Sequence, residues 1–338
     1  MARYLGDINT RARGLRTHLL SNGDLERLAR SSSLSALQRE LNALGYARAD
    51  GPATAASLEQ SVRRRAASHM AVLERWCTDD RRAALSVIFE DEDRRSIQSL
   101  LRGAARGTSP ETRMMTLVPT QSLPERALFG LAKQPTPTDV VRMLVLWNHP
   151  FGAALVPAAS RAHPSLFEME IELQRAFARR ATASAKEGGR QLVEYVGQVV
   201  DLMNIWSALL HFEERDPSMV DLVFVEGGHW ITRDLFQKLM SLETRKELER
   251  RIASSLRNSA LASAFRGEID DLAELEEAVL RAQIEWQNRA VRLDPSGAAP
   301  VVGFAIELRA QVLNLMRIVW GVALRAPAAL IQAEMVIT

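Results

Sequence analysis

The sequence has few of the residues that build a covalent or metal-bound core. Its 338 residues include one cysteine, Cys77, so no disulfide can form within the chain, and this is typical of a reducing compartment. The six histidines show no paired spacing that would suit zinc. We therefore expect a buried or half-buried thiol at Cys77, no metal site and no other cofactor.

Neither charge nor hydrophobicity is concentrated in one place. The chain carries 43 basic and 41 acidic residues, and a net charge of +2 gives no strong field to attract nucleic acid or an anionic bilayer. The longest stretch without charged side chains, residues 143–160, contains Asn148, His149 and two prolines, so it makes a poor membrane span. Arginines interrupt the N-terminus, which has no apolar signal core. The sequence thus predicts a soluble protein that binds no nucleic acid.

No catalytic constellation is found. The acidic run Glu90–Asp93 has no second acidic motif to share a magnesium ion with, and a solvated helix face is the favoured interpretation. Glu226-Gly227-Gly228-His229 has the Glu-x-x-His spacing of di-iron bundles, but two glycines oppose the helix that this spacing requires. A structural turn at Gly227 and Gly228 is the better interpretation. We predict no catalytic residue, and an enzyme is a poor interpretation.

What the sequence does have is helical periodicity. Apolar residues recur at spacings of three and four, as in Leu166, Met169, Leu173 and Phe177, and no convincing alternation indicates a strand. Prolines and glycines break residues 103–138 into short helices, and we expect the preceding long helix to end at Gly103. The predicted fold class is all-α.

One short motif occurs three times, in the windows 93–103, 201–211 and 311–321, which follow one another at nearly equal intervals. Each window places a small polar residue before an apolar trio on one helix face: Ser96 before Ile97, Leu100 and Leu101; Asn204 before Ile205, Ala208 and Leu209; Asn314 before Leu315, Ile318 and Val319. Asparagine is roughly 0.6 kcal/mol worse than alanine in mid-helix. Either solvent exposure or a hydrogen bond to another helix or a partner would explain Asn204 and Asn314.

Three apolar quartets precede these windows, each with internal gaps of three, nine and four residues: Leu25, Leu28, Leu37 and Leu41; Leu128, Leu131, Val140 and Leu144; Phe236, Leu239, Leu248 and Ile252. Quartet and window alternate along the chain, which predicts a tandem threefold repeat. The predicted repeats run roughly over residues 20–110, 120–215 and 230–338, within a single domain of residues 1–338. We call them repeats one, two and three.

The order of these motifs resembles that of a known family. The residues that carry the likeness are Tyr4-Leu5 and Arg11–Leu15 near the start, Asp201, Asn204-Ile205 and Phe224–Gly228 in the middle, and Leu313–Ile318 with Gly321 near the end. They resemble the central-stalk subunit of rotary V-type and archaeal/bacterial A/V-type ATPases, called C in prokaryotes and d in eukaryotes. The likeness spans residues 4 to 335.

The resemblance implies a funnel of three similar helical units about a pseudo-threefold axis. It implies a socket, with one end receiving the central-shaft subunits and the other resting on the membrane rotor-ring subunits. Such a subunit transmits torque for ATP-driven ion transport or ATP synthesis and binds no nucleotide. It implies a cytoplasmic protein, peripheral on the cytoplasmic face of the membrane.

The same resemblance singles out candidate contact residues. A socket for a polar shaft needs a polar lining, and Arg102, Asn204, Asn314 and Arg317 are our candidates for that lining or for bonds between repeats. Repeat one departs from the family pattern because serine stands at position 96, and repeat three departs because Gln311 replaces an aspartate. Two rival interpretations remain: a helical adaptor or scaffold unrelated to rotary ATPases, and an enzyme whose helical site gives no sequence signal.

Overall fold

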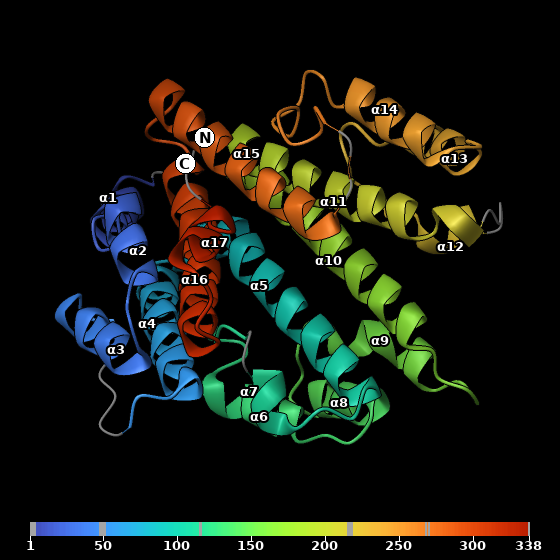
Figure 1. Ribbon diagram of the computed structural model, residues 1–338. Coiled ribbons are helices and arrows are strands. Elements are labelled where there is room, and N and C mark those ends of the chain that lie inside the picture. The colour runs from blue at the N-terminus through green and yellow to red at the C-terminus, as the bar shows by residue number, and fades with distance from the viewer. Residues whose placement is uncertain are drawn as a thin grey trace.

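The computed structural model describes residues 5–46, 52–114, 117–214, 219–267, 269 and 271–336. Within these ranges the fold is helical and has no strand, which confirms the all-α prediction (Figure 1). Tyr4, part of the family-like opening, lies outside the described residues.

Three pairs of short helices hold the three apolar quartets: α2 (Asn22–Ala29) with α3 (Leu34–Ala43), α7 (Glu125–Ala132) with α8 (Pro137–Leu146), and α13 (Arg233–Met240) with α14 (Arg245–Ser255). All twelve quartet residues are buried. Hydroxyl side chains cap five of the six helices, for example Ser21 on α2 and Thr232 on α13, while Pro124 precedes α7. The pairs lie at three separate edges of the molecule (Figure 1).

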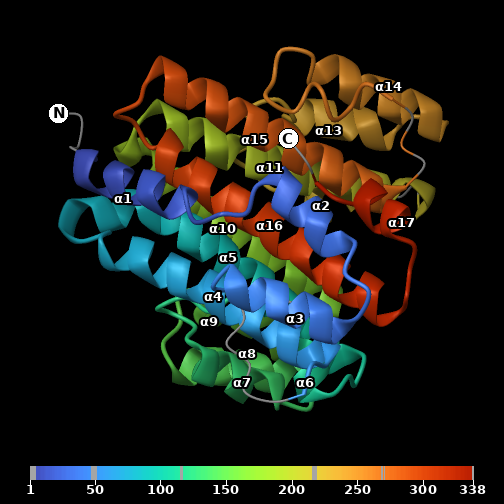
Figure 2. The same ribbon diagram turned by 60° about the vertical axis from the view of Figure 1, so that its left-hand side comes forward.

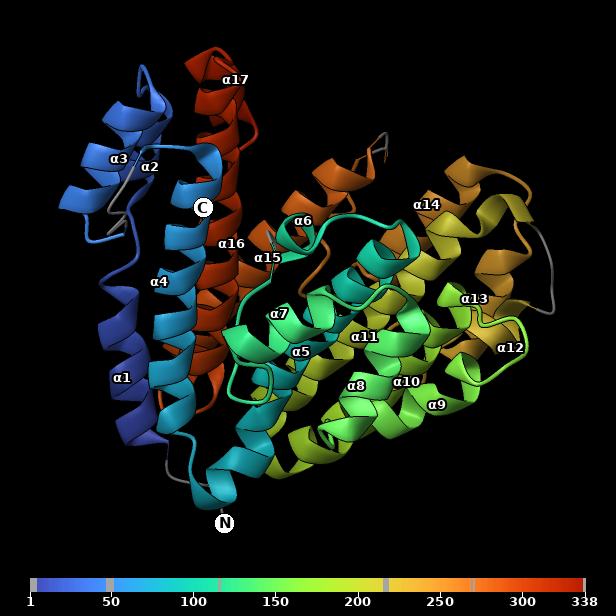
Figure 3. The ribbon, with the colours of Figure 1, turned by 90° about the horizontal axis from the view of Figure 1, so that it is seen from below.

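Six long helices form the interior: α4 (Ala55–Arg75), α5 (Asp79–Ala105), α10 (Leu166–Gly188), α11 (Arg190–Leu210), α15 (Leu272–Leu293) and α16 (Ala299–Ala323). α10 packs on α11 and α15 packs on α16, as antiparallel neighbours with short turns should. α4 and α5 instead diverge from their turn (Figure 3), and α4 packs on α16 whereas α5 packs on α10.

Each apolar trio packs on a short-helix pair that belongs to another predicted repeat. The trio of α5 lies in one core cluster with the quartet of α7 and α8, and the trio of α11 with that of α13 and α14. The trio of α16, near the end of the chain, shares a cluster with the quartet of α2 and α3, near its start. The packing therefore runs from each repeat to the next and from the last back to the first.

The remaining helices are short. They are α1 (Gly6–Arg16), α6 (Pro110–Met114), α9 (Gly152–Ala159), the 3-10 helix η1 (Phe212–Glu214), α12 (Met219–Val223) and α17 (Ala328–Ala333). α1 lies along α16 and α4 (Figure 2). Its Asn9 amide donates to the carbonyl of Gly297 at 2.9 Å, in the turn between α15 and α16, and its Asp7 pairs with Arg81 at 2.6 Å. α1 thus joins the start of α5 to the turn between α15 and α16.

The end of α5 differs from the expectation at Gly103. The helix continues to Ala105, and Arg106 is its C-cap residue. Gly107 follows at φ 64°. Gly103 lies inside the helix, and its missing side chain leaves room for Arg113: a Cβ there would lie 2.7 Å from the Arg113 Cγ. α16 is long and apolar enough to cross a membrane, but most of its apolar window is buried against α1, α4 and α15, as in the core helix of a soluble fold.

Candidate functional site

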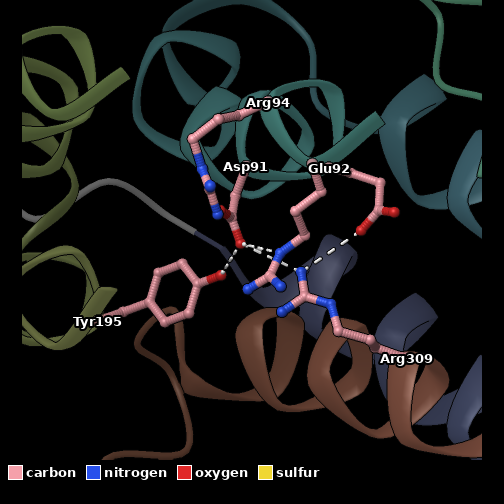
Figure 4. Close-up of polar contacts among 6 residues, drawn as sticks. Asp91, Glu92, Arg94, Tyr195 and Arg309 are labelled. Carbon is pink, nitrogen blue, oxygen red and sulfur yellow. Dashed lines mark hydrogen bonds and ion pairs between the residues drawn. The ribbon is translucent and has the colours of Figure 1, made fainter. Parts of the chain in front are cut away.

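Asp91 lies at the point where α5, α11 and α16 meet, and its side chain is fully buried (Figure 4). Its carboxylate accepts hydrogen bonds from Arg94 at 2.7 Å and Arg95 at 3.2 Å, both on α5. It also accepts from the Tyr195 hydroxyl of α11 at 3.3 Å and from Arg309 of α16 at 3.1 Å. One carboxylate therefore ties together three long helices, one from each predicted repeat.

The charge of Asp91 is stabilised by its surroundings. Burial alone would raise the pKa of Asp91, but the positive charges of Arg95, Arg94 and Arg309 outweigh it and hold that pKa well below its usual range. Burial raises the pKa of the Tyr195 hydroxyl above its ordinary value, so this group stays a neutral donor. Glu92 adds a contact of 3.4 Å to Arg309. The group is an ion-pair network without a proton to exchange near neutral pH.

The solvated face expected for Glu90–Asp93 is wrong for half of that run, because Asp91 and Asp93 are both buried. The signal that could have found Asp91 lies in the repeat, because the equivalent positions in repeats two and three hold Val199 and Arg309. Val199 is a buried apolar residue, which indicates that the whole position faces inward. An aspartate and an arginine at two equivalent inward positions can then pair.

The repeated aspartate position holds the segment that leads into the next short-helix pair. Asp201 accepts hydrogen bonds from the backbone amides of His229 at 3.2 Å, Trp230 at 3.1 Å and Ile231 at 2.8 Å, just before α13. Burial outweighs these bonds and raises the pKa of Asp201. Gln311 of α16 accepts from the amide of Leu20, just before α2.

Asp93 does the same task with different partners. It accepts from the hydroxyl of Thr120 at 2.5 Å and from the hydroxyl of Ser122, both shortly before α7. The ring of His149, from the turn between α8 and α9, lies 3.5 Å from the same carboxylate. Side-chain hydroxyls here replace the backbone amides that Asp201 binds.

Asn204 and Asn314 are buried, so solvent exposure does not explain them. Both form hydrogen bonds instead. The Asn204 amide donates to the carbonyl of Val225 at 2.8 Å and accepts from the amide of the same residue at 2.9 Å. Asn314 makes the same pair of bonds with Val336, both at 2.8 Å. Each asparagine therefore clamps a segment about one turn beyond a short helix.

Ser96, the equivalent residue in repeat one, makes no such clamp. Its hydroxyl is buried and has no hydrogen-bond partner among the residues that the structure describes. The counterpart of Val225 is Leu117, which stands as far beyond Ser96 as Val225 stands beyond Asn204. The amide of Leu117 donates instead to Met114 at 3.3 Å. A serine side chain is too short to span the distance that an asparagine covers.

The two candidate glycines lie against the Asp201 clamp. Gly227 has φ 114° in a turn, a conformation that favours glycine, and a Cβ there would lie 2.8 Å from the Thr182 hydroxyl. A Cβ on Gly228 would lie 2.3 Å from a carboxylate oxygen of Asp201. Gly228 therefore lets the backbone approach closely enough for its following amides to reach that carboxylate.

The two candidate arginines have different surroundings. Arg317 pairs with Glu277 of α15 at 2.5 Å and donates to the carbonyl of Glu334, so it holds the C-terminal segment beside Asn314. Arg102 makes a two-point ion pair with Glu170 of α10 at 2.6 and 2.8 Å, and it remains half exposed.

Arg102 also lines a cavity of about 610 Å³ in the fork between α4 and α5, with α16 as its third wall. Asn204, Asn314 and Arg317 are not among its lining residues. Of the four candidates, then, one faces this cavity and three hold connecting segments. No group of three or more histidine, cysteine, aspartate or glutamate side chains suited to a metal ion occurs in the described part of the chain.

Fold and site together define an all-α protein in which a buried ion-pair network joins three of the long inner helices. Residues 8–334 match the family described as ATP synthase (C/AC39) subunit. Two similar proteins are the V-type ATP synthase subunits C of two Thermus thermophilus strains, each 24% identical over 281 residues and covering 82% of both chains. The chain belongs to the ATP synthase (C/AC39) subunit family.

Proposed function

We propose that this protein is the non-catalytic central-stalk subunit of a rotary V- or A-type ATPase. In this proposal it couples the rotating shaft to the membrane rotor ring and sits on the cytoplasmic face of the membrane. The observation that carries the proposal is the family match over residues 8–334. It serves ATP-driven ion transport or ATP synthesis, and an unrelated helical adaptor is not favoured by that match.

We further propose that the three predicted repeats form a closed ring with a socket at its centre. The supporting observation is that the α16 trio packs on α2 and α3 as the other trios pack on the pair that follows them. A closed ring suits torque transmission, because a load on one repeat is carried by contacts to both neighbours. The Asp91 network adds resistance to shear, since its partners lie on three different helices.

A bridging assay tests the coupling role. Purified central-shaft subunits are immobilised, and detergent-solubilised rotor ring is added with or without this protein. We expect the ring to be retained only when the protein is present, and each partner to bind it separately. If the protein binds neither the shaft nor the ring, with both shown to be folded, the proposal is overturned. Binding of only one partner would also overturn the coupling role.

A further inference from the structure

Of the three walls of the cavity in the α4–α5 fork, those formed by α16 and α5 have opposite character. The α16 wall is apolar apart from Arg309, which pairs with Asp91 and Glu92 of α5. Its apolar residues recur at spacings that place them on one helix face: Ala305, Leu308, Val312, Leu313 and Met316. Those positions cover eleven steps along the helix, or about 17 Å at 1.5 Å per residue.

The α5 wall is polar and rich in arginine. Besides Ile88 and Gln98, this wall is lined by residues that also follow one helix face: Glu92, Arg95, Ser96, Ser99, Arg102, Gly103 and Arg106. The cavity is therefore a trough with one apolar and one polar side, each about three turns or more in length.

Positive charge is in excess around this trough. The lining contains five arginines (Arg95, Arg102, Arg106, Arg113 and Arg309) and two glutamates, Glu92 and Glu276. Asp91 and Glu170, which pair with lining arginines from just outside the lining, reduce the excess and do not cancel it. Arg106 is exposed and pairs with no acidic side chain among the described residues, so its charge faces solvent.

Two buried polar atoms at the trough also lack a partner in the described part of the chain. They are the hydroxyl of Ser96, a residue with 3% of its surface exposed, and the Nε of Arg309. A buried polar group without a hydrogen bond costs roughly 1–3 kcal/mol. Both groups are donors that an acceptor entering the trough could satisfy.

We propose that the trough receives one amphipathic helix of a partner, with its apolar face on α16 and an acidic edge along α5. An apolar groove of this length fits three turns of a helix, and the arginines of α5 select carboxylates over amines. The inference rests on the proposed function in one respect, because the proposed function makes the central shaft the partner. Entry lies on the side of repeat one, where α4 and α5 are apart and the asparagine clamp is missing.

The first experiment uses the full-length protein and two synthetic helical peptides long enough to fill the trough, about five helical turns each. Both peptides carry the same leucine face; one has a glutamate edge and the other a lysine edge, and a hydrocarbon staple equalises their helicity. Fluorescence anisotropy measures affinity. We expect saturable binding of the glutamate peptide, about tenfold tighter than the lysine peptide. Equal binding of both peptides, or tighter binding of the lysine peptide, overturns the proposal.

Variants then place the peptide in the trough. Arg106→Glu is expected to weaken the glutamate peptide about tenfold, and the control Arg39→Glu, the same charge change on the exposed face of α3, leaves it unchanged. Leu313→Gln, in the apolar wall, weakens both peptides, and circular dichroism checks that it folds. Equal effects of Arg106→Glu and Arg39→Glu would show that the trough is not the site.

A binding assay with the assembled central shaft distinguishes failure of this inference from failure of the proposed function. If wild-type protein and all variants bind the shaft equally, the trough proposal fails and the stalk role stands. If the glutamate peptide binds the trough and the shaft does not bind the protein at all, the stalk role fails and the trough proposal stands. When both hold, the shaft displaces the labelled peptide, and Arg106→Glu weakens shaft binding as well.

Discussion

Asp93 and Asp201 occupy equivalent positions on α5 and α11, and both are buried, yet they hold the following segment in different ways. Asp201 binds three consecutive backbone amides, whereas Asp93 binds the hydroxyls of Thr120 and Ser122. The cause is one position, because Thr120 stands as far beyond Asp93 as Gly228 stands beyond Asp201. Glycine admits the backbone to the carboxylate, while threonine keeps it away and supplies a hydroxyl instead.

Equivalent carboxylates can thus hold equivalent segments through different hydrogen-bond donors. Backbone amides cannot turn to another acceptor when the carboxylate is removed, but hydroxyls can rotate. Loss of the carboxylate should therefore destabilise the junction after repeat two more than the junction after repeat one.

Removing each carboxylate should give the largest difference in stability between the two junctions. Asp201→Ala leaves three amides without an acceptor, and we expect a loss of about 3–5 kcal/mol in the free energy of unfolding. Asp93→Ala should cost about 1–3 kcal/mol, because the hydroxyls of Thr120 and Ser122 lie 3.1 Å apart and can bond to each other. Urea unfolding of the full chain measures both. Equal losses would contradict the distinction between amide and hydroxyl partners.

Adding one methyl group at Gly228 attacks the same clamp from its other side. The Cβ of Gly228→Ala would lie 2.3 Å from the Asp201 carboxylate, so the carboxylate or the backbone must shift, at a cost of about 2–3 kcal/mol. Gly14→Ala is the matched control. Gly14 is exposed in α1, and a Cβ added there would have no other atom within 4 Å, so alanine should stabilise that helix by about 0.5–1 kcal/mol. A neutral Gly228→Ala would show that close approach is not required.

The asparagine position sharpens the contrast. Asn204→Ser converts repeat two to the residue of repeat one and should cost about 2 kcal/mol, since both bonds to Val225 are lost. Ser96→Ala should be neutral or stabilising by up to about 1 kcal/mol, because it removes a buried hydroxyl that has no partner in the described structure. Thermal unfolding compares them. A destabilised Ser96→Ala would indicate that the hydroxyl does make a stabilising contact.

The smallest effect concerns Glu74 of α4, which accepts from the amide of Gln121 at 2.8 Å beside the Asp93 junction. Burial raises the pKa of Glu74 from 4.5 to about 6. Its contribution to stability is therefore complete below pH 4.5 and is lost as the pH rises through about 6. Glu74→Gln keeps an acceptor without the charge, so it should be more stable than wild type by about 1–2 kcal/mol at pH 7.5 and equal to it at pH 4.

Glu276→Gln, on the exposed side of α15 and beyond its first turn, is the control for Glu74→Gln and should change nothing at either pH. Guanidinium unfolding at the two pH values measures both variants. A gain for Glu74→Gln that is the same at pH 4 would rule out the titration of Glu74 as its cause.

Periodicity made the helices and the buried quartets predictable, because apolar spacing depends only on neighbours along the chain. The burial of Asp91 and Asp93 was not predictable by that route. A carboxylate is expected to be exposed unless its partners are known, and Arg309 and Tyr195 lie 218 and 104 residues away in sequence. The sequence signal for Asp91 is the equivalent residue of repeat two, because the apolar Val199 indicates that this position faces inward. The mid-helix position of Asn204 is apparent from the sequence, but its hydrogen-bond partner Val225 is determined by the fold.

The contact between Asn9 and Gly297 has a consequence for how the protein is made. The two residues are 288 positions apart, so α1 leaves the ribosome long before the turn on which it docks has been synthesised. Until then α1 can pack on α4 but not on α16, so its apolar residues Ile8 and Ala12, with Leu5 just before them, stay partly uncovered. Docking of α1 on this turn is thus a late event of biosynthesis. A nascent chain stalled before the last hairpin would expose an apolar segment to chaperones or proteases.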